Sequence, residues 1–432
     1  MRHLELEGRF DQPRILDGSK EHQLSLLLSI MPSADLQAIE AGAAIGTHIC
    51  LLIDVSQSME EDDKLDAAVN AARELIMLVD AHDSISIVAF DEEVYTLSSH
   101  CSGVDKDNLI EALNGLRSVG GGMTNMAMGL KGANEQLCLG QNDGQARVIL
   151  LLSDGEDNFC KADALNAAVL ATDANVQIFA IGIGADYDAN FLKAVIAPSN
   201  GSLFGDTDVE KIKEAFIDVA VTLANVVATQ ASLNLRFHRD ALVGKSYKAS
   251  PDQLFLGSPE LDKERCTLRR VGNIERNKKY AFLFEVTAPA AGRGVWPVLT
   301  VSISYDVPAL GVFGATAEQT YSVEYLDNVS LTTARDGAVL ECYRRVQITE
   351  LVERFVDAHQ GGNAEKTARY LELLIQKYDD VNDQKMVNHY SGIRTDLIGG
   401  GLITKAMLNA SVIASTIVQG GGELPRLVDD TF

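Results

Sequence analysis

The feature that most constrains the fold is an alternation of apolar runs with segments of helical spacing between residues 46 and 228. The apolar runs predict buried strands at residues 48–53, 84–90, 147–152 and 176–183. The segments between and after them predict helices at residues 64–79, 106–116, 162–174, 190–196 and 209–228. This alternation is typical of an α/β fold with a doubly wound, mostly parallel sheet and helices on both faces. In such folds ligands bind beyond the carboxyl ends of the strands.

A second pattern begins near Leu233, where apolar and polar residues alternate in runs separated by Gly, Pro and Asn. Examples are residues 233–237, 281–286 and 299–305. This period of two predicts an antiparallel β-sandwich, which follows the α/β domain in the chain. Because residues 231–327 are few for a sandwich with a covered core, we expect N-terminal strands to complete it. The α/β domain would then be inserted into the sandwich.

The rest of the chain has helical spacing. Apolar periods predict helices at residues 339–358, 364–378 and 402–418, with glycines between them. The triple glycine at residues 420–422 predicts a flexible tail. The predicted parts are N-terminal strands at 1–45, the α/β domain at 46–228, the β-sandwich at 229–330, a C-terminal α-helical region at 331–419 and the tail at 420–432.

Charge and cysteine content limit the kinds of binding partner and the cellular compartment that we expect. A net charge of −24 opposes binding to nucleic acid and to anionic membrane surfaces. No apolar run approaches the roughly 20 residues that a membrane-spanning helix needs, and the first residues lack the pattern of a signal peptide. The six cysteines are scattered without a C-x-x-C pair, which argues against a disulfide framework. We therefore expect a cytoplasmic protein without membrane insertion.

Three turns at the predicted ligand-binding edge carry oxygen donors. Asp54, Ser56 and Ser58 follow the first strand, Thr124 follows a Gly-rich loop, and Asp154 follows the third strand. Carboxylates and hydroxyls without His or Cys are suited to a hard cation, so we expect Mg²⁺, with Ca²⁺ or Mn²⁺ as alternatives. A cation held directly by hydroxyls is poorly neutralised, so an exposed carboxylate of a partner would complete its coordination.

The order of these residues resembles the von Willebrand factor A (VWA) domain and its metal-ion-dependent adhesion site (MIDAS). The matching segments are Asp54-Val55-Ser56-Gln57-Ser58, Gly121-Gly122-Met123-Thr124-Asn125 and Ser153-Asp154-Gly155. The resemblance covers about residues 46–228, and Met123 replaces a glycine that often precedes the threonine. The flanking parts resemble those of bacterial multidomain relatives of the inter-alpha-trypsin inhibitor heavy chain.

The resemblance implies a role for each residue of a complete MIDAS. Ser56 and Ser58 would ligate the metal directly, and Thr124 would do so directly or through water. Asp54 and Asp154 would act largely through water. Family members often bind ligands through the ion and change affinity by moving the last helix of the domain, here residues 209–228.

The favoured function is a non-enzymatic, metal-dependent protein–protein interaction module, in which a partner's Asp or Glu binds the MIDAS Mg²⁺. One alternative is an adaptor subunit of an intracellular AAA+ ATPase, or of a kinase or phosphatase signalling assembly, because intracellular relatives often work there. The other alternative is a metal-dependent hydrolase, although the sequence suggests no base or nucleophile beside the site.

Three further features have competing interpretations. The acidic run at residues 60–63 fits a second cation, or a helix N-terminus that favours negative charge. Trp296, which precedes Pro297, is predicted to fill the β core rather than to anchor a partner. Asp429 and Asp430 in the tail are anions of the kind that an open metal site binds. They make self-association through the tail an open hypothesis.

Overall fold

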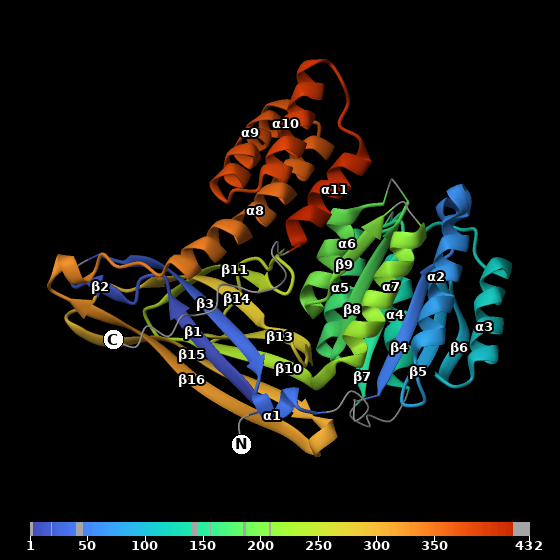
Figure 1. Ribbon diagram of the computed structural model, residues 1–432, viewed down its shortest axis with the longest axis horizontal. Coiled ribbons are helices and arrows are strands. Elements are labelled where there is room, and N and C mark those ends of the chain that lie inside the picture. Colours follow the sequence, from blue (N-terminus) through green and yellow to red (C-terminus); the bar gives the residue numbers. More distant parts are fainter. Residues whose placement is uncertain are drawn as a thin grey trace.

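A six-stranded sheet forms the centre of the α/β part (Figure 1). The computed structural model describes residues 3–18, 20–39, 46–139, 145–155, 157–184, 187–206 and 209–417. The strand order is β6-β5-β4-β7-β8-β9, and every pair is parallel except β5 with β6. The bounds are β4 (Thr47–Asp54), β5 (Ser84–Phe90), β6 (Val94–Ser102), β7 (Ala146–Ser153), β8 (Val176–Ile183) and β9 (Leu203–Asp206).

Helices cover both faces of this sheet. One face carries α2 (Lys64–Leu78), α3 (Lys106–Gly115) and α7 (Val209–Ala224), and the other carries α4 (Met126–Cys138), α5 (Lys161–Asp173) and α6 (Ala189–Ile196). The central strand β4 accounts for this layering. Ile49, Leu51 and Ile53 join the core under α2, whereas Cys50 and Leu52 join the core under α4. A parallel strand between two helical layers is apolar on both faces, which is the pattern seen in the sequence.

Two five-stranded sheets form a sandwich beside the α/β part (Figure 1). Their orders are β1-β3-β14-β11-β12 and β13-β10-β15-β16-β2, with all pairs antiparallel except β16 with β2. The bounds are β1 (Leu4–Phe10), β2 (Arg14–Leu16), β3 (His22–Pro32), β10 (Val226–Phe237), β11 (Leu242–Ser250), β12 (Leu254–Phe255), β13 (Cys266–Glu275), β14 (Tyr280–Ala288), β15 (Gly294–Val307) and β16 (Val312–Leu326).

Strands from both sides of the α/β part of the chain make this sandwich. β3 precedes the α/β sheet in sequence but pairs with β14, which follows it, with Leu28 opposite Phe282. The alternate residues Leu24, Leu26 and Leu28 of β3 point into the core between the two sheets. The predicted fold class is therefore confirmed, with a mostly parallel sheet, antiparallel sheets and C-terminal helices. The exact boundaries of the predicted domains stay predictions.

Four helices end the described chain: α8 (Gly337–Gln360), α9 (Ala364–Asp380), α10 (Gln384–Ile398) and α11 (Lys405–Thr416). Val339 and Val346 of α8 pack against Leu27 and Leu283 on the outer face of the sandwich. Helix α8 therefore lies along the sandwich (Figure 1). Within the described ranges, no helix combines the length and apolarity needed to cross a bilayer. The predicted tail at residues 420–432 lies outside the described residues.

Two sequence-based expectations about single elements are wrong, and one helix was not predicted. Helix α10 was not predicted, because its buried stripe, although helically spaced, consists of only Met386, Tyr390 and Ile393. The last helix of the α/β part ends at Ala224 rather than at residue 228, since β10 begins at Val226. Trp296 does not fill the β core.

Trp296 lies in the exposed first part of β15 and keeps 44% of its surface accessible. Its indole Nε1 donates a hydrogen bond to Gly292 O at 2.9 Å, and its ring meets Tyr325 edge-on. The polar end of the indole is thus satisfied by a neighbouring loop, so the side chain stays at the edge of the sandwich.

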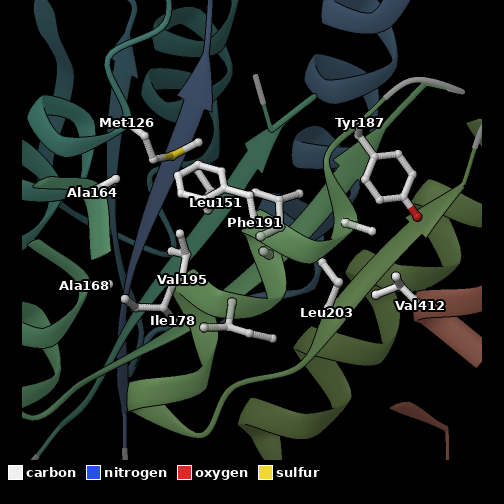
Figure 2. Close-up of a cluster of buried hydrophobic side chains, with 14 of the residues drawn as sticks. Met126, Leu151, Ala164, Ala168, Ile178, Tyr187, Phe191, Val195, Leu203 and Val412 are labelled. Carbon is white, nitrogen blue, oxygen red and sulfur yellow. The ribbon is translucent and has the colours of Figure 1, made fainter. Parts of the chain in front are cut away.

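The C-terminal helices share a hydrophobic core with the α/β part (Figure 2). Val412 of α11 lies beside Leu203 of β9 in this core. Asn409 of the same helix donates its side-chain Nδ2 to Tyr187 O at 2.7 Å. Helix α11 is therefore packed against the α/β sheet by both apolar and polar contacts.

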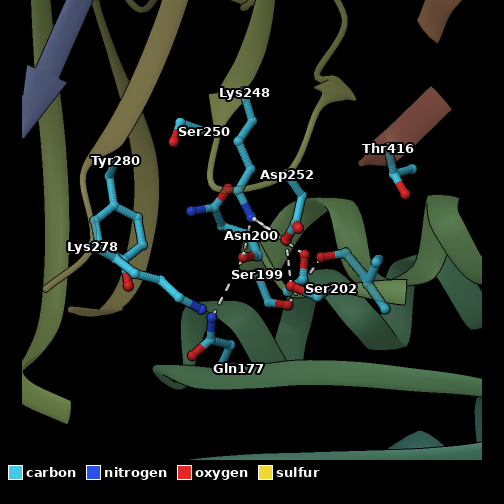
Figure 3. Close-up of polar contacts among 12 residues, drawn as sticks. Gln177, Ser199, Asn200, Ser202, Lys248, Ser250, Asp252, Lys278, Tyr280 and Thr416 are labelled. Atoms are coloured by element: carbon cyan, nitrogen blue, oxygen red, sulfur yellow. Dashed lines mark hydrogen bonds and ion pairs between the residues drawn. The ribbon is translucent and has the colours of Figure 1, made fainter. Parts of the chain in front are cut away.

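A buried lysine joins the sandwich to the α/β part (Figure 3). Lys248, at the end of β11, donates from Nζ to Asn200 O at 3.0 Å and to Gly201 O at 3.4 Å, both in the α/β part. Its Nζ also lies 3.4 Å from the carboxylate of Asp252. The neighbouring Gln253 N donates to Thr416 O of α11 at 2.8 Å. Burial lowers the pKa of Lys248, and Asp252 opposes that shift.

Replacing Lys248 by Met should lower the free energy of unfolding by about 2 kcal/mol, because the buried carbonyl oxygens of Asn200 and Gly201 lose their charged donor. Thermal and denaturant unfolding of the full chain measure this loss. The matched control is Arg14→Gln, which breaks the exposed ion pair with Glu324 and should cost about 1 kcal/mol or less. Equal losses in the two variants would show that Lys248 has no special role at the junction.

Candidate metal centre

The first turn of the candidate centre follows β4 and is organised around the carboxylate of Asp54. Asp54 is fully buried. Its Oδ1 accepts a hydrogen bond from Ser56 N at 3.0 Å, and its Oδ2 accepts one from Ser153 Oγ at 2.6 Å. The hydroxyl oxygens of Ser56 and Ser58 lie 3.2 Å apart. The turn thus gathers one carboxylate and two hydroxyls at the carboxyl end of the central strand.

The loop that carries Thr124 is hydrogen-bonded to this turn. Gly121 N donates to Val55 O at 2.8 Å, and Gln57 N donates to Gly122 O at 3.0 Å. Gly120 has a φ of +91°, and a Cβ built there would lie 2.3 Å from Val55 O. Only glycine therefore allows the loop to approach so closely. The backbone contacts bring the Thr124 loop to the Asp54 turn.

Thr124 itself is almost fully buried and is fixed from the opposite side. Its backbone N donates to the side-chain Oδ1 of Asn158 at 2.7 Å, and its carbonyl accepts from Asn158 N at 3.0 Å. The adjacent Met123 keeps 52% of its surface exposed, so this departure from the family pattern leaves the packing of Thr124 intact.

Asp91 shapes the same loop from the end of β5. Its Oδ2 accepts from Gly122 N at 3.0 Å, and its carbonyl accepts from Asn125 N at 3.0 Å. Asp91 is itself buried. Asp91, directly after β5, thus supports the Thr124 loop, although it is not one of the predicted ligands.

The third turn follows β7 and places Asp154, which is 2% exposed, at the same edge. Its carbonyl accepts from Asp188 N at 3.0 Å. Its Oδ2 lies 3.2 Å from Nζ of Lys64, and the same Nζ donates to Ser58 O at 3.2 Å. Lys64 therefore links the Asp154 turn directly to the turn that carries the serines.

The buried Asp54 carboxylate is affected by its surroundings. The pKa of Asp54 is raised to about 7, chiefly by burial; the hydrogen bonds from Ser153 and Ser56 oppose this shift, and the charge of Asp154 adds to it. A nearby divalent cation would reverse the effect of burial on Asp54.

The geometry brings the predicted residues together in different ways. Asp54, Ser56 and Ser58 share direct hydrogen bonds or close oxygens, whereas Thr124 joins them through its backbone loop. Asp154 joins them through the neighbouring Ser153 and through Lys64. The sequence interpretation assigned no role to Ser153, Lys64, Asn158 or Asp91. Of these, only Asp91 carried a usable signal, because it is an acidic residue directly after a predicted strand.

The donor chemistry fits a hard divalent cation. The five predicted residues contribute carboxylate and hydroxyl oxygens, which Mg²⁺, Ca²⁺ and Mn²⁺ prefer. In the part of the chain that the structure describes, no group of three or more His, Cys, Asp and Glu side chains could hold a metal. The candidate centre therefore combines two carboxylates with three hydroxyls. The side chain of residue 62 in the acidic run at 60–63 lies outside the described part of the structure, so a second cation there stays a prediction.

Comparisons of sequence identify the family of the α/β part. The family model of the von Willebrand factor type A domain matches residues 48–217. An uncharacterised protein of Synechocystis sp. is 23% identical over 342 residues, which are 77% of this chain and 79% of that protein. Calcium-activated chloride channel regulator 1 of Bos taurus is 25% identical over 206 residues, which are 46% of this chain but 22% of that protein.

Solved structures show the same fold over nearly the whole chain. A von Willebrand factor type A protein from Catenulispora acidiphila has a TM-score of 0.79 at 16% identity, covering 97% of this chain and 98% of that one. The ArnB paralog VWA2 from Sulfolobus acidocaldarius has a TM-score of 0.59 at 16% identity, covering 96% of this chain and 98% of that one. With the family match, these likenesses identify residues 48–217 as a von Willebrand factor type A domain.

Proposed function

We propose that Asp54, Ser56, Ser58, Thr124 and Asp154 form a complete MIDAS that holds one divalent cation, with Mg²⁺ as the resident ion. The observation that carries this proposal is the buried Asp54 carboxylate, bonded to Ser56 and Ser153 beside two hydroxyls that are 3.2 Å apart. VWA domains commonly bind a divalent metal at this position. The bound cation would supply a coordination position for an external carboxylate.

The proposed function is metal-dependent protein–protein interaction through an Asp or Glu of the partner. The family assignment supports it, because VWA domains are generally interaction or adhesion modules. Ser56, Ser58 and Thr124 would hold the cation, while Asp54 and Asp154 would orient the water around it and balance its charge. We propose a binding role rather than an enzymatic one.

We further propose that the other parts of the chain act as a scaffold for this site. In this proposal residues 1–45 and 229–330 form one β unit, residues 331–419 form the helical unit, and both orient the VWA domain. The shared core with α11 and the Lys248 junction support a fixed orientation. We also propose a cytoplasmic location, which the six free thiols support, because disulfides form in oxidising compartments.

Wild-type protein should bind one Mg²⁺ per chain in a calorimetric titration. The double variant Asp54→Ala with Ser56→Ala should weaken this binding by at least about 100-fold, since it removes a proposed ligand and the carboxylate beside it. The matched control is Ser99→Ala, which removes an exposed hydroxyl bonded to Gln136 on the same domain. Unchanged affinity in the double variant, or no binding by the wild type, contradicts the proposed metal centre.

Partner capture from native lysate should depend on the metal. A protein retained in Mg²⁺ should be lost in EDTA and lost with the Asp54→Ala, Ser56→Ala variant, whereas Ser99→Ala should retain it. Retention that ignores both treatments would falsify the metal-dependent role.

A chain that lacks residues 420–432 tests whether the tail mediates self-association. If its oligomeric state by light scattering equals that of the full chain, the tail does not mediate self-association.

The stability of the metal-free protein should fall as pH rises toward neutrality. Burial raises the pKa of Asp54 from 3.8 to about 7, so the folded chain holds a proton that the unfolded chain has lost. The contribution of protonated Asp54 to the free energy of unfolding is fully present below pH 3.8 and is lost by about pH 7. The loss amounts to at most about 4 kcal/mol. Unfolding in EDTA across this range should show the wild type losing stability relative to Asp54→Asn, whose amide does not titrate. A pH-independent difference between the two would contradict the buried-carboxyl interpretation.

A further inference from the structure

Lys64 is a cation built into the candidate metal centre. It is the first residue of α2, directly after Asp63, whose left-handed backbone turns the chain into the helix. Its Nζ lies 3.2 Å from Asp154 Oδ2 and donates to Ser58 O at 3.2 Å. The Lys64 side chain is 11% exposed and that of Asp154 is 2% exposed. The ammonium group is therefore largely enclosed between two turns that carry proposed metal residues.

The fold leaves a defined space for this lysine. Gly184, which follows β8, has a φ of +93°. A Cβ at this glycine would lie 2.8 Å from Cε of Lys64. Any larger residue at position 184 would both strain the backbone and displace the lysine stem. The side chain thus occupies a slot that the end of a neighbouring strand provides.

The buried carboxylates beside Lys64 give this lysine an influence on metal binding. Asp54 and Asp154 are both buried, and the charge of Asp154 raises the pKa of Asp54. Lys64 compensates part of this negative charge from the side of Asp154. A divalent cation at the centre would be attracted by the same carboxylates and repelled by the ammonium group. The two cations cannot both gain the full stabilisation that Asp154 offers.

We propose that Lys64 is an internal counter-cation that competes with the divalent metal for the carboxylate of Asp154. This inference rests on the proposed MIDAS. Lys64 keeps the acidic centre neutralised when no metal is bound, and it weakens metal binding by repulsion. Lys64 is therefore an affinity-setting residue of the site rather than a ligand.

A purely structural lysine leads to a different expectation. If Lys64 only tied the two turns together, its loss would loosen the site, weaken metal binding and lower stability in the presence and absence of metal alike. A counter-cation instead opposes the metal. Its loss should strengthen metal binding and should lower stability mainly when metal is absent.

The variant Lys64→Met keeps the aliphatic stem and removes the charge. It should bind Mg²⁺ and Mn²⁺ at least about tenfold more tightly than the wild type in calorimetric titrations, because a unit charge facing a divalent ion is removed. Its melting temperature should fall in EDTA and recover in saturating Mg²⁺. Lys64→Gln, which retains a donor for Ser58 O, should behave in the same way and serves if Lys64→Met does not fold. Lys64→Arg keeps the charge and should not gain affinity.

The matched control is Lys213→Met, because Lys213 pairs with Glu74 of α2 rather than with a site carboxylate. It should leave metal affinity unchanged. Equal or weaker Mg²⁺ binding by both Lys64→Met and Lys64→Gln, with normal binding by the wild type, overturns the counter-cation alone. Absence of Mg²⁺ and Mn²⁺ binding in the wild type overturns the proposed metal centre and the counter-cation together.

Discussion

The burial of the Asp54 carboxylate is the constraint on which the rest of the site depends. A carboxylate removed from water is costly unless hydrogen bonds or charges compensate it. Two donors do so directly, Ser56 N and Ser153 Oγ, and they come from the ends of two neighbouring strands. The parallel sheet makes this possible, because it brings the carboxyl ends of β4 and β7 to one edge. The Ser56 and Ser58 hydroxyls are then held close together by the turn that satisfies the carboxylate.

The rest of the molecule is connected to this edge through packed elements. Asp154 O accepts a hydrogen bond from Asp188 N, at the start of α6. The preceding residue, Tyr187, accepts one from Asn409 of α11. The helical region therefore contacts the segment that supports the Asp154 turn. At the other end of the VWA domain, Lys248 joins the sandwich to residues 200 and 201.

The spacing of apolar residues along the chain predicted most of the strands and helices. The predictions that failed did so for physical reasons. Strands such as β4 are apolar on both faces, so they could be predicted as buried parallel strands from the sequence alone. Helix α10 was missed because its buried stripe consists of only Met386, Tyr390 and Ile393, whereas α8 has ten buried residues. Trp296 was misplaced because a side chain's burial depends on where its strand lies in the sandwich. The strand that begins with exposed residues leaves the indole at the surface.

By itself, the sequence determined the order and chemistry of the candidate ligands, since Asp54, Ser56, Ser58, Thr124 and Asp154 each follow a strand end or a Gly-rich loop. Whether those residues bind a metal stays a prediction. Only the tertiary structure decided how they are supported. It brought Ser153 to Asp54, Asn158 and Asp91 to the Thr124 loop, and Lys64 to Asp154. Lys64 and Asp154 are 90 positions apart, so no local period relates them. The charge balance of a buried site depends on such distant neighbours, because electrostatic compensation acts through space.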